Sequence, residues 1–287
     1  MNTGSTTTRA SDRTTDVPRV RSVVRPRTVD DIVAALADGG PTARPHAGGT
    51  DLMVQLKEGR LRPAALVDLS LVDELRAIEF GDDAIVIGAA RPMADILDDT
   101  RVCLAFPALA DAIRVVGSVQ IRHRATLGGN IANASPAADT VPALVALESV
   151  ARIAGPEGRR TAPVASLLAR PGRTTLAPAE IITAVELPTA PPSASAYLRL
   201  TRRTSVDLAL ISTAVVVREG SPPRVAFGAA GPVIERNAAV EEALAVGWPP
   251  GYGTIPADVL DRAALAAIDA VRPITDVRAG ERYRRAM

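Results

Sequence analysis

The chain has 287 residues, 33 basic and 32 acidic side chains, and a hydrophobic fraction of 47%. This ordinary globular composition excludes wholesale disorder, and the length allows one large domain or two moderate ones. One cysteine and two histidines exclude an intrachain disulfide, an iron–sulfur cluster held by this chain alone and a multi-histidine metal centre.

The N-terminal segment at 1–19 is polar and lacks the apolar core of a signal peptide. It is predicted to be a disordered tail of a cytoplasmic protein. No apolar run reaches the roughly 18–20 residues that a membrane span needs, so no membrane-spanning segment is expected. The arginines are scattered among an equal number of carboxylates, and aromatic residues are few, which argues against nucleic-acid binding.

The first helix is predicted from its capping signals. Thr28 fits an N-cap with the acidic Asp31 three residues later, and Gly39-Gly40 ends the helix. The run at 102–116 carries apolar residues at helical spacing and predicts one long helix. The other elements expected in this half are strands at 20–24, 43–47, 65–69 and 84–90, a helix at 52–58 that ends at Gly59, and turns at Gly48-Gly49-Thr50-Asp51 and Gly128-Gly129-Asn130.

The stretch from Pro188 to Ser195 has the clearest linker composition in the chain. It places a domain boundary at about residue 190, with an α+β domain on each side. The elements expected around it are a helix at 137–147, strands near 150–153 and at 181–187, 197–201, 209–218 and 224–229, and helices at 238–246, 256–271 and 279–287.

Two segments have a composition that suits a phosphate group. They run from Pro45 to Leu52 and from Thr126 to Asp139, and each places paired glycines and small polar residues before a predicted helix. Glycine permits positive φ and close approach to the backbone, and such a turn exposes a row of N–H donors. One such turn is weak evidence, because helix caps and bulges use the same residues. Two in one domain predict a diphosphate gripped from both sides.

The common nucleotide motifs are absent from the chain. No G-x-G-x-x-G follows a strand, and no G-x-x-x-x-G-K-[ST] occurs, so neither a Rossmann site nor a P-loop is supported. The hydrolase motifs H-E-x-x-H and G-x-S-x-G are missing as well. A nucleotide cofactor would therefore bind in some other fold.

The segment from Gln120 to Asp139 resembles the long central signature of the FAD-binding medium subunit of molybdenum hydroxylases, the family that includes carbon monoxide dehydrogenase and xanthine dehydrogenase. Three further segments resemble the family in the same order, namely 180–188, 202–211 and 276–285. The resemblance covers the chain from about residue 20 to its end. It implies an α+β fold, with a two-lobed, vanillyl-alcohol-oxidase-like FAD-binding domain at 20–190 and a C-terminal domain of the carbon monoxide dehydrogenase flavoprotein type, a small antiparallel sheet with helices, at 192–287.

The resemblance also assigns residues to the cofactor. The first segment would hold the FAD pyrophosphate through backbone N–H groups and the Thr50 hydroxyl, and the second would complete the grip. Asp139 would accept hydrogen bonds from flavin or adenosine hydroxyls, and the Arg199 charge would stabilise reduced flavin. The full set is Ala47, Gly48, Gly49, Thr50, Asp51, Gly88, Ala89, Thr126, Gly129, Asn130, Asp139, Ile181, Ile182 and Arg199.

Several of these residues have simpler structural interpretations. Asp51 and Ser135 would also serve as helix caps, Ile181 and Ile182 as core, and Asp207 with Arg202 and Arg203 as a surface ion pair. Two further residues are departures from the family, with His123 and Ala125 standing where relatives mostly have Asn and Gly; for His123 a hydrogen-bonding role is favoured over that of a base. In covalent flavoproteins of the related type the linking histidine falls where Thr50 stands, so FAD is expected to be non-covalent.

The resemblance implies an electron-transfer subunit with no metal or catalytic residue of its own. A molybdenum cofactor would lie on a large partner and two-iron two-sulfur clusters on a small one, with the three chains forming a dimer of heterotrimers. Electrons would pass from the clusters to FAD and on to NAD, a quinone or oxygen, and the single cysteine fits this division. The alternatives are a stand-alone FAD-dependent oxidase or dehydrogenase acting on a small molecule, and a scaffold that has lost its flavin.

Overall fold

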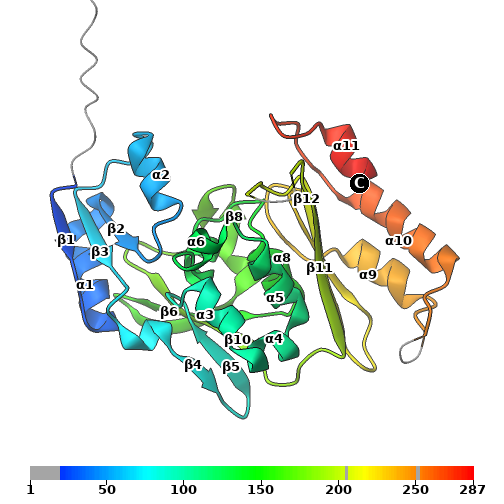
Figure 1. Ribbon diagram of the computed structural model, residues 1–287, viewed down its shortest axis with the longest axis horizontal. Helices are drawn as coiled ribbons and strands as arrows, with labels where there is room; N and C mark the ends of the chain where they lie inside the picture. The colour runs from blue at the N-terminus through cyan, green and yellow to red at the C-terminus, as the bar shows by residue number, and fades with distance from the viewer. Residues whose placement is uncertain (1–19, 204–205, 250–252) are drawn as a thin grey trace, which may run out of the picture.

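Three main β-sheets follow one another along the long axis of the molecule (Figure 1). The computed structural model describes residues 20–203, 206–249 and 253–287. The tail predicted at 1–19 lies outside the described residues. Within the described residues, α3 to α8 follow one another, the strands β6 to β13 come next, and α9 to α11 close the chain; these runs of helices and strands confirm the predicted α+β class.

The first lobe is built on a parallel sheet with strand order β1-β3-β2. Helix α1 begins at the predicted cap, because the Asp31 N–H donates to Thr28 Oγ1 at 3.1 Å, and it buries Ile32 and Leu36 against the sheet. The elements are β1 (Ser22–Val24), α1 (Val29–Gly39), β2 (Ala43–His46), α2 (Leu52–Lys57) and β3 (Ala65–Asp68). His46 and Asp68 are paired at the carboxyl ends of β2 and β3, which is the edge where the first glycine segment leaves the sheet.

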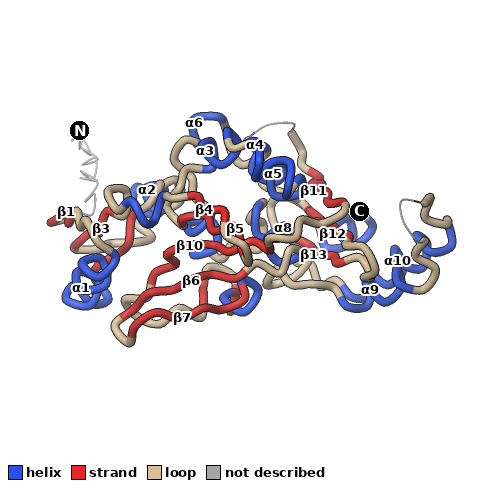
Figure 2. The backbone as a smooth tube through the Cα atoms, turned by 90° about the horizontal axis from the view of Figure 1, so that it is seen from below, coloured by secondary structure: helices blue, strands red, loops and turns tan. Residues whose placement is uncertain are grey.

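The second lobe contains an antiparallel sheet with strand order β4-β5-β10-β6-β7. Its central strand, β10, is buried over most of its length. The strands are β4 (Ile78–Phe80), β5 (Ala84–Gly88), β6 (Val150–Gly155), β7 (Gly158–Pro163) and β10 (Ile181–Pro188), with a small hairpin of β8 (Leu168–Arg170) and β9 (Arg173–Thr174) beside them. Figure 2 shows α3, α4, α5 and α6 grouped on one side of this sheet.

The helices of this lobe are shorter than the sequence predicts. The single helix expected at 102–116 is wrong: α4 (Thr100–Ala105) ends at Phe106 and α5 begins at Pro107. Proline lacks the N–H that would continue the helix and pushes the preceding residue out of the α region, and Phe106 accordingly has φ −131° and ψ 68°. The helices are α3 (Met93–Asp98), α4, α5 (Pro107–Arg114), α6 (Val119–Arg122), α7 (Leu127–Ala132) and α8 (Thr140–Ala146), and short 3₁₀ turns lie at Gly40–Thr42, Asp73–Arg76 and Val164–Leu167.

The C-terminal sheet packs directly on the second lobe. One of its faces buries Tyr197, Val216 and Ala226 in the same apolar cluster as Phe106 and Leu109. Its other face is covered by α9 and α10 (Figure 1). The elements are β11 (Ala194–Leu200), β12 (Ile211–Val217), β13 (Arg224–Gly228), α9 (Ala238–Ala245), α10 (Ala257–Ala270) and α11 (Glu281–Ala286). The boundary predicted near residue 190 falls between β10 and β11, and the division into domains stays a prediction.

No helix in the described ranges has the length and apolar composition needed to cross a bilayer.

Candidate functional site

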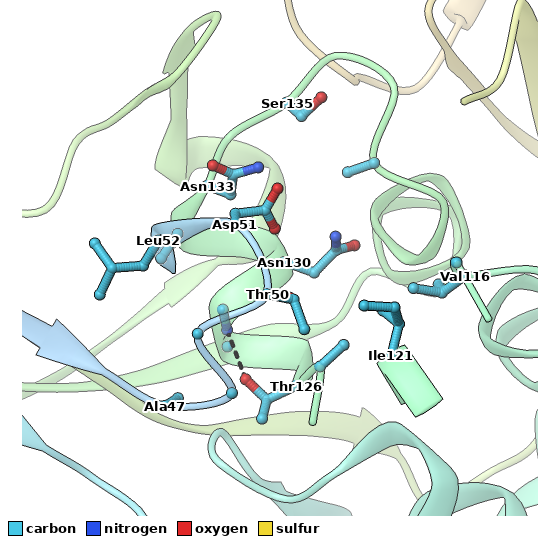
Figure 3. A pocket seen from close by; sticks show the side chains of 18 of the residues that line it. Ala47, Thr50, Asp51, Leu52, Val116, Ile121, Thr126, Asn130, Asn133 and Ser135 are labelled. Carbon is cyan, nitrogen blue, oxygen red and sulfur yellow. Dashed lines mark hydrogen bonds between the residues drawn. The ribbon is translucent and has the colours of Figure 1, made fainter. Parts of the chain in front are cut away.

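A cavity of about 780 Å³ lies where the two lobes and the C-terminal part of the chain meet. This volume is in the range of pockets that bind cofactor-sized ligands. Its walls come from residues 44–55 and Leu69 of the first lobe, from Ala89 and 116–139 in the second, from 176–182, and from Arg203 and 206–208. Figure 3 labels Thr50 and Asp51 of the first glycine segment and Asn130 and Asn133 of the second among the residues that line this cavity.

The first glycine segment packs against the chain that leads directly into the second. A Cβ built on Gly48 would lie 1.8 Å from the carbonyl oxygen of Arg124, so only glycine allows the two backbones to approach this closely. Both segments line the cavity. The structure therefore brings the two predicted segments together at one site.

The first segment offers a row of unpaired donors. Within the described residues, the backbone N–H groups of Gly48, Gly49, Thr50 and Asp51 have no hydrogen-bond acceptor. Gly49 has φ +75°, a conformation that turns the chain sharply between β2 and α2. These residues are half-exposed or exposed, and four successive amides without a protein acceptor at a cavity wall form a donor array suited to an anion.

The second segment is not the turn that its composition predicts. Gly128, Gly129 and Asn130 lie in the first turn of helix α7, and Thr126 is the N-cap, its Oγ1 accepting from the Gly129 N–H at 3.1 Å (Figure 3). The Gly128 N–H donates to the Ala89 carbonyl at 3.0 Å. These two amides are therefore already paired, and the glycines serve helix packing: a Cβ on Gly128 would lie 2.6 Å from Ala89 Cβ.

What the second segment presents to the cavity is a side-chain amide. Asn130 Oδ1 accepts a hydrogen bond from Thr140 Oγ1 at 2.6 Å, which fixes which end of the amide faces which way. Among the described residues, the Asn130 NH₂ group has no acceptor. It is a donor at the wall opposite the free backbone amides of the first segment.

Asp139 and Arg199 form a buried ion pair at the junction with the C-terminal sheet. Arg199 Nη1 lies 3.0 Å from Asp139 Oδ2, and the two side chains are only 7% and 9% exposed. The Tyr197 hydroxyl donates to Asp139 Oδ1 at 2.8 Å. Burial raises the pKa of Asp139, and the charge of Arg199 and the bonds from Tyr197 and Arg199 oppose this rise. Asp139 lines the cavity and Arg199 does not, so the arginine charge is neutralised behind the wall.

The remaining predicted residues divide between the cavity and the core. Ala47, Ala89, Ile181 and Ile182 line the cavity, whereas Gly88 does not. The absence of a side chain at Gly88 is explained by packing, because a Cβ there would lie 2.4 Å from the Leu75 backbone.

The structural interpretations of the polar residues have different outcomes. Ser135 Oγ accepts from the Ala137 N–H at 3.3 Å, but this bond closes a turn rather than capping a helix, because α8 begins only at Thr140 with Asp139 as its N-cap. Asp51 stands at the N-cap position of α2, as that interpretation expects, but its side chain makes no capping hydrogen bond. Asp207 accepts from the backbone N–H groups of Arg202 and Arg203, which holds the chain that lines the cavity at 206–208.

Apolar residues that the sequence did not single out form much of the wall. Val116 and Ile121 border the cavity from the helical side, and Leu176 and Leu208 border it from two loops. Their composition resembles that of ordinary core residues, so no sequence signal distinguishes them. No group of three or more His, Cys, Asp or Glu side chains suited to a metal ion occurs in the described parts of the chain. The cavity thus combines a row of unpaired backbone donors with an apolar lining.

Known proteins match this chain over nearly its whole length. The carbon monoxide dehydrogenase medium chain of Hydrogenophaga pseudoflava is 30% identical over 267 residues, 91% of each chain. The xanthine dehydrogenase FAD-binding subunit of Escherichia coli O157:H7 is 33% identical over 215 residues, 72% of this chain and 73% of the relative.

Solved structures agree with these matches. Carbon monoxide dehydrogenase from Hydrogenophaga pseudoflava, in a form that lacks the Mo-pyranopterin moiety of its molybdenum cofactor, matches with a TM-score of 0.87, 30% identity and 94% coverage of each chain. Quinoline 2-oxidoreductase from Pseudomonas putida 86 matches with a TM-score of 0.83 and 26% identity, covering 92% of this chain and 91% of the other. The model of the FAD binding domain in molybdopterin dehydrogenase matches residues 18–190. By sequence and by fold, the chain belongs to this family of FAD-binding subunits of molybdopterin dehydrogenases.

Proposed function

We propose that this chain is the electron-transfer flavoprotein of a molybdenum hydroxylase complex, taking electrons from iron–sulfur clusters of a small partner and delivering them from FAD to NAD, a quinone or oxygen. The observation that carries the proposal is the row of free amides from Gly48 to Asp51 at the wall of a large cavity, in a chain whose family binds FAD.

The donor set fits the cofactor. A diphosphate needs several hydrogen-bond donors and little competing negative charge. Of the carboxylates that line the cavity, Asp139 is paired with Arg199, Glu180 with Arg160 and Asp207 with backbone N–H groups, and burial raises the pKa of Asp51. The four free amides and the Thr50 hydroxyl face the diphosphate from one side and the Asn130 amide from the other. Apolar side chains such as Ile121, Leu176 and Ile182 line the cavity and would contact the ring systems of the cofactor. The residues thus support non-covalent binding of FAD.

The chemistry belongs to the cofactor. Bound FAD supplies electron storage and transfer through its isoalloxazine ring. The chain's own residues bind and orient it: the amides fix the diphosphate, and the Asp139–Arg199 pair holds the C-terminal sheet against the cavity.

We assign the metal centres of the complex to two partner subunits. This chain has one cysteine and, in its described residues, no cluster suited to a metal, so molybdenum and two-iron two-sulfur centres are assigned to a large and a small partner. We propose a dimer of heterotrimers, by analogy with the multi-subunit carbon monoxide dehydrogenases that it resembles.

Purification of the complex from its source tests the proposal. Native mass spectrometry is expected to report this chain with FAD, a large partner carrying the molybdenum cofactor and a small iron–sulfur partner. Acid denaturation of the yellow complex should release FAD, and mixing the reduced complex with NAD, a quinone or oxygen identifies the acceptor. A colourless chain that cannot be loaded with FAD would contradict the proposal.

The Asn130→Asp variant is expected to bind FAD about tenfold to a hundredfold more weakly, which corresponds to about 1.5–3 kcal/mol for a hydrogen bond to a charged group. The change keeps the size of the side chain and its acceptor for Thr140 but replaces the donor at the cavity with a carboxylate oxygen. Titration of flavin fluorescence measures the affinity. The matched control is Asn237→Asp, a cap of α9 away from the cavity, where aspartate caps equally well. Unchanged affinity in Asn130→Asp would show that this amide does not face the diphosphate.

A further inference from the structure

His46 lies at the cavity wall, near the start of the first glycine segment. It is the last residue of β2, and its imidazole lines the cavity. The ring lies directly against the turn at Gly49, since a Cβ built on that glycine would be 2.6 Å from His46 Nε2. In the described residues, Nε2 has no hydrogen-bond partner. An imidazole nitrogen that is available for a hydrogen bond therefore lies beside the turn that carries the four free backbone amides.

The other ring nitrogen of His46, Nδ1, points toward a carboxylate. Asp68, the register partner of His46 on β3, has its Oδ1 3.8 Å from His46 Nδ1, and both side chains are largely buried. Burial raises the pKa of Asp68, but hydrogen bonds from Ser70 and the charges of His46 and Arg25 lower it more, so the net pKa is below its usual value. Asp68 is therefore an anion at neutral pH, and it favours an N–H at Nδ1.

The other basic side chains at the cavity are engaged elsewhere. Arg44 Nη1 donates to the carbonyls of Pro41 and Ala43, which turns its guanidinium back along its own strand. Arg203 donates to the Val206 carbonyl and is mostly exposed at the rim. Among the described basic residues that line the cavity, His46 is the one whose nitrogen lies against the turn with the free amides.

We propose that His46, held by Asp68, donates a hydrogen bond from Nε2 to the diphosphate of FAD and supplies the positive charge that the backbone amides lack. The proposal rests on FAD binding at this cavity. In this arrangement Asp68 faces Nδ1 and the diphosphate faces Nε2, so that the ring bridges β3 and the ligand. Asp68 is then a positioning residue, and His46 is a direct ligand contact.

Replacement of His46 tests the bridge in the full-length chain after removal of FAD. His46→Leu is expected to weaken FAD binding roughly tenfold to a hundredfold, the usual range for a hydrogen bond to a charged group. ADP, which carries the diphosphate without the flavin, should lose affinity by the same factor in competition with FAD. His46→Gln, which keeps a donor without the charge, and Asp68→Asn should show smaller losses.

Salt dependence separates this role from simple packing. The affinity of the wild-type chain for FAD should fall more steeply with ionic strength than that of His46→Leu. Salt screens the attraction between the His46 charge and the diphosphate, and the leucine variant has no such attraction to lose. The matched control is His123→Gln. His123 is the only other histidine in the sequence; it is exposed and does not line the cavity. FAD affinity and its salt dependence should therefore be unchanged in this variant.

Each outcome is decisive. Circular dichroism and the thermal midpoint identify variants that fold, and His46→Gln carries the test if His46→Leu does not. Wild-type affinity for FAD and ADP in a folded His46 variant would overturn the bridge, as would a loss for FAD with none for ADP. A wild-type chain that binds no FAD would instead overturn the proposed function, so the two failures are distinguishable.

Discussion

Replacing Arg199 by methionine is expected to lower the free energy of unfolding by about 3–5 kcal/mol, because the change leaves a buried carboxylate without its cation. Arg199 Nη1 lies 3.0 Å from Asp139 Oδ2, and both side chains are almost fully shielded from water. Methionine keeps most of the volume of the arginine stem, so the loss is electrostatic rather than a cavity effect. The Tyr197 hydroxyl still donates to Asp139, but one neutral donor does not replace a guanidinium.

Urea unfolding measures the loss in the free energy of unfolding. It is applied to Arg199→Met, to the double variant Asp139→Leu with Arg199→Met, and to a surface control. The double variant should recover much of the loss, since removing both charges of a buried pair is often neutral or stabilising. The control is Arg114→Met, which breaks the half-exposed pair with Asp111 and should change stability by less than about 1 kcal/mol. Equal losses in Arg199→Met and Arg114→Met would show that the buried pair has no special weight.

The ion pair between Asp139 and Arg199 could not be predicted from the sequence. The resemblance places Asp139 and Arg199 each at the cofactor, but the two residues are 60 positions apart, and nothing in their spacing indicates that they face each other. The contact arises because β11 packs on the second lobe, with Tyr197 in the shared core. Long-range pairing of this kind depends on the tertiary arrangement rather than on local pattern.

Local signals were reliable where the chain itself sets the geometry. The Thr28 cap, the turn at Gly59 and the strand from Ala65 are found where composition places them. Apolar periodicity alone failed at 102–116, because it does not register that Pro107 interrupts the backbone hydrogen bonds. Edge strands such as β7, whose residues are largely exposed, carry no apolar signal and were not predicted.

The paired glycines illustrate a different limit. Composition indicates that the chain needs glycine at these positions but not what approaches the missing side chain. At Gly128 the neighbour is Ala89, at Gly49 it is His46, and at Gly48 it is the Arg124 backbone. The protein itself thus accounts for these glycines, and the evidence for a diphosphate comes instead from the unpaired amides of the first segment.

Gly48→Ala is expected to abolish stable FAD retention, because the new Cβ would lie 1.8 Å from the Arg124 carbonyl oxygen and 2.5 Å from its carbonyl carbon. These are backbone atoms of the chain that leads into the second segment, so no side-chain rotation relieves the overlap, and the two stretches of backbone must separate. Overpacking in a close-packed region costs about 1–3 kcal/mol. Displacement of the amides from Gly48 to Asp51 should then weaken FAD binding by at least about tenfold, since each 1.4 kcal/mol of lost interaction is a factor of ten.

The FAD content of the purified variant and the affinity of its FAD-free form measure this effect. Gly280→Ala is the matched control: that glycine has ordinary backbone angles, and a Cβ there would meet no atom within 4 Å. It should keep wild-type FAD content. Gly172→Ala adds a second comparison, since Gly172 has φ +70° but open space around it; alanine there strains the backbone without touching the junction. If Gly48→Ala retains FAD as Gly280→Ala does, the contact between these two stretches of backbone does not hold the cofactor site together. If Gly172→Ala loses FAD equally, general destabilisation accounts for the effect.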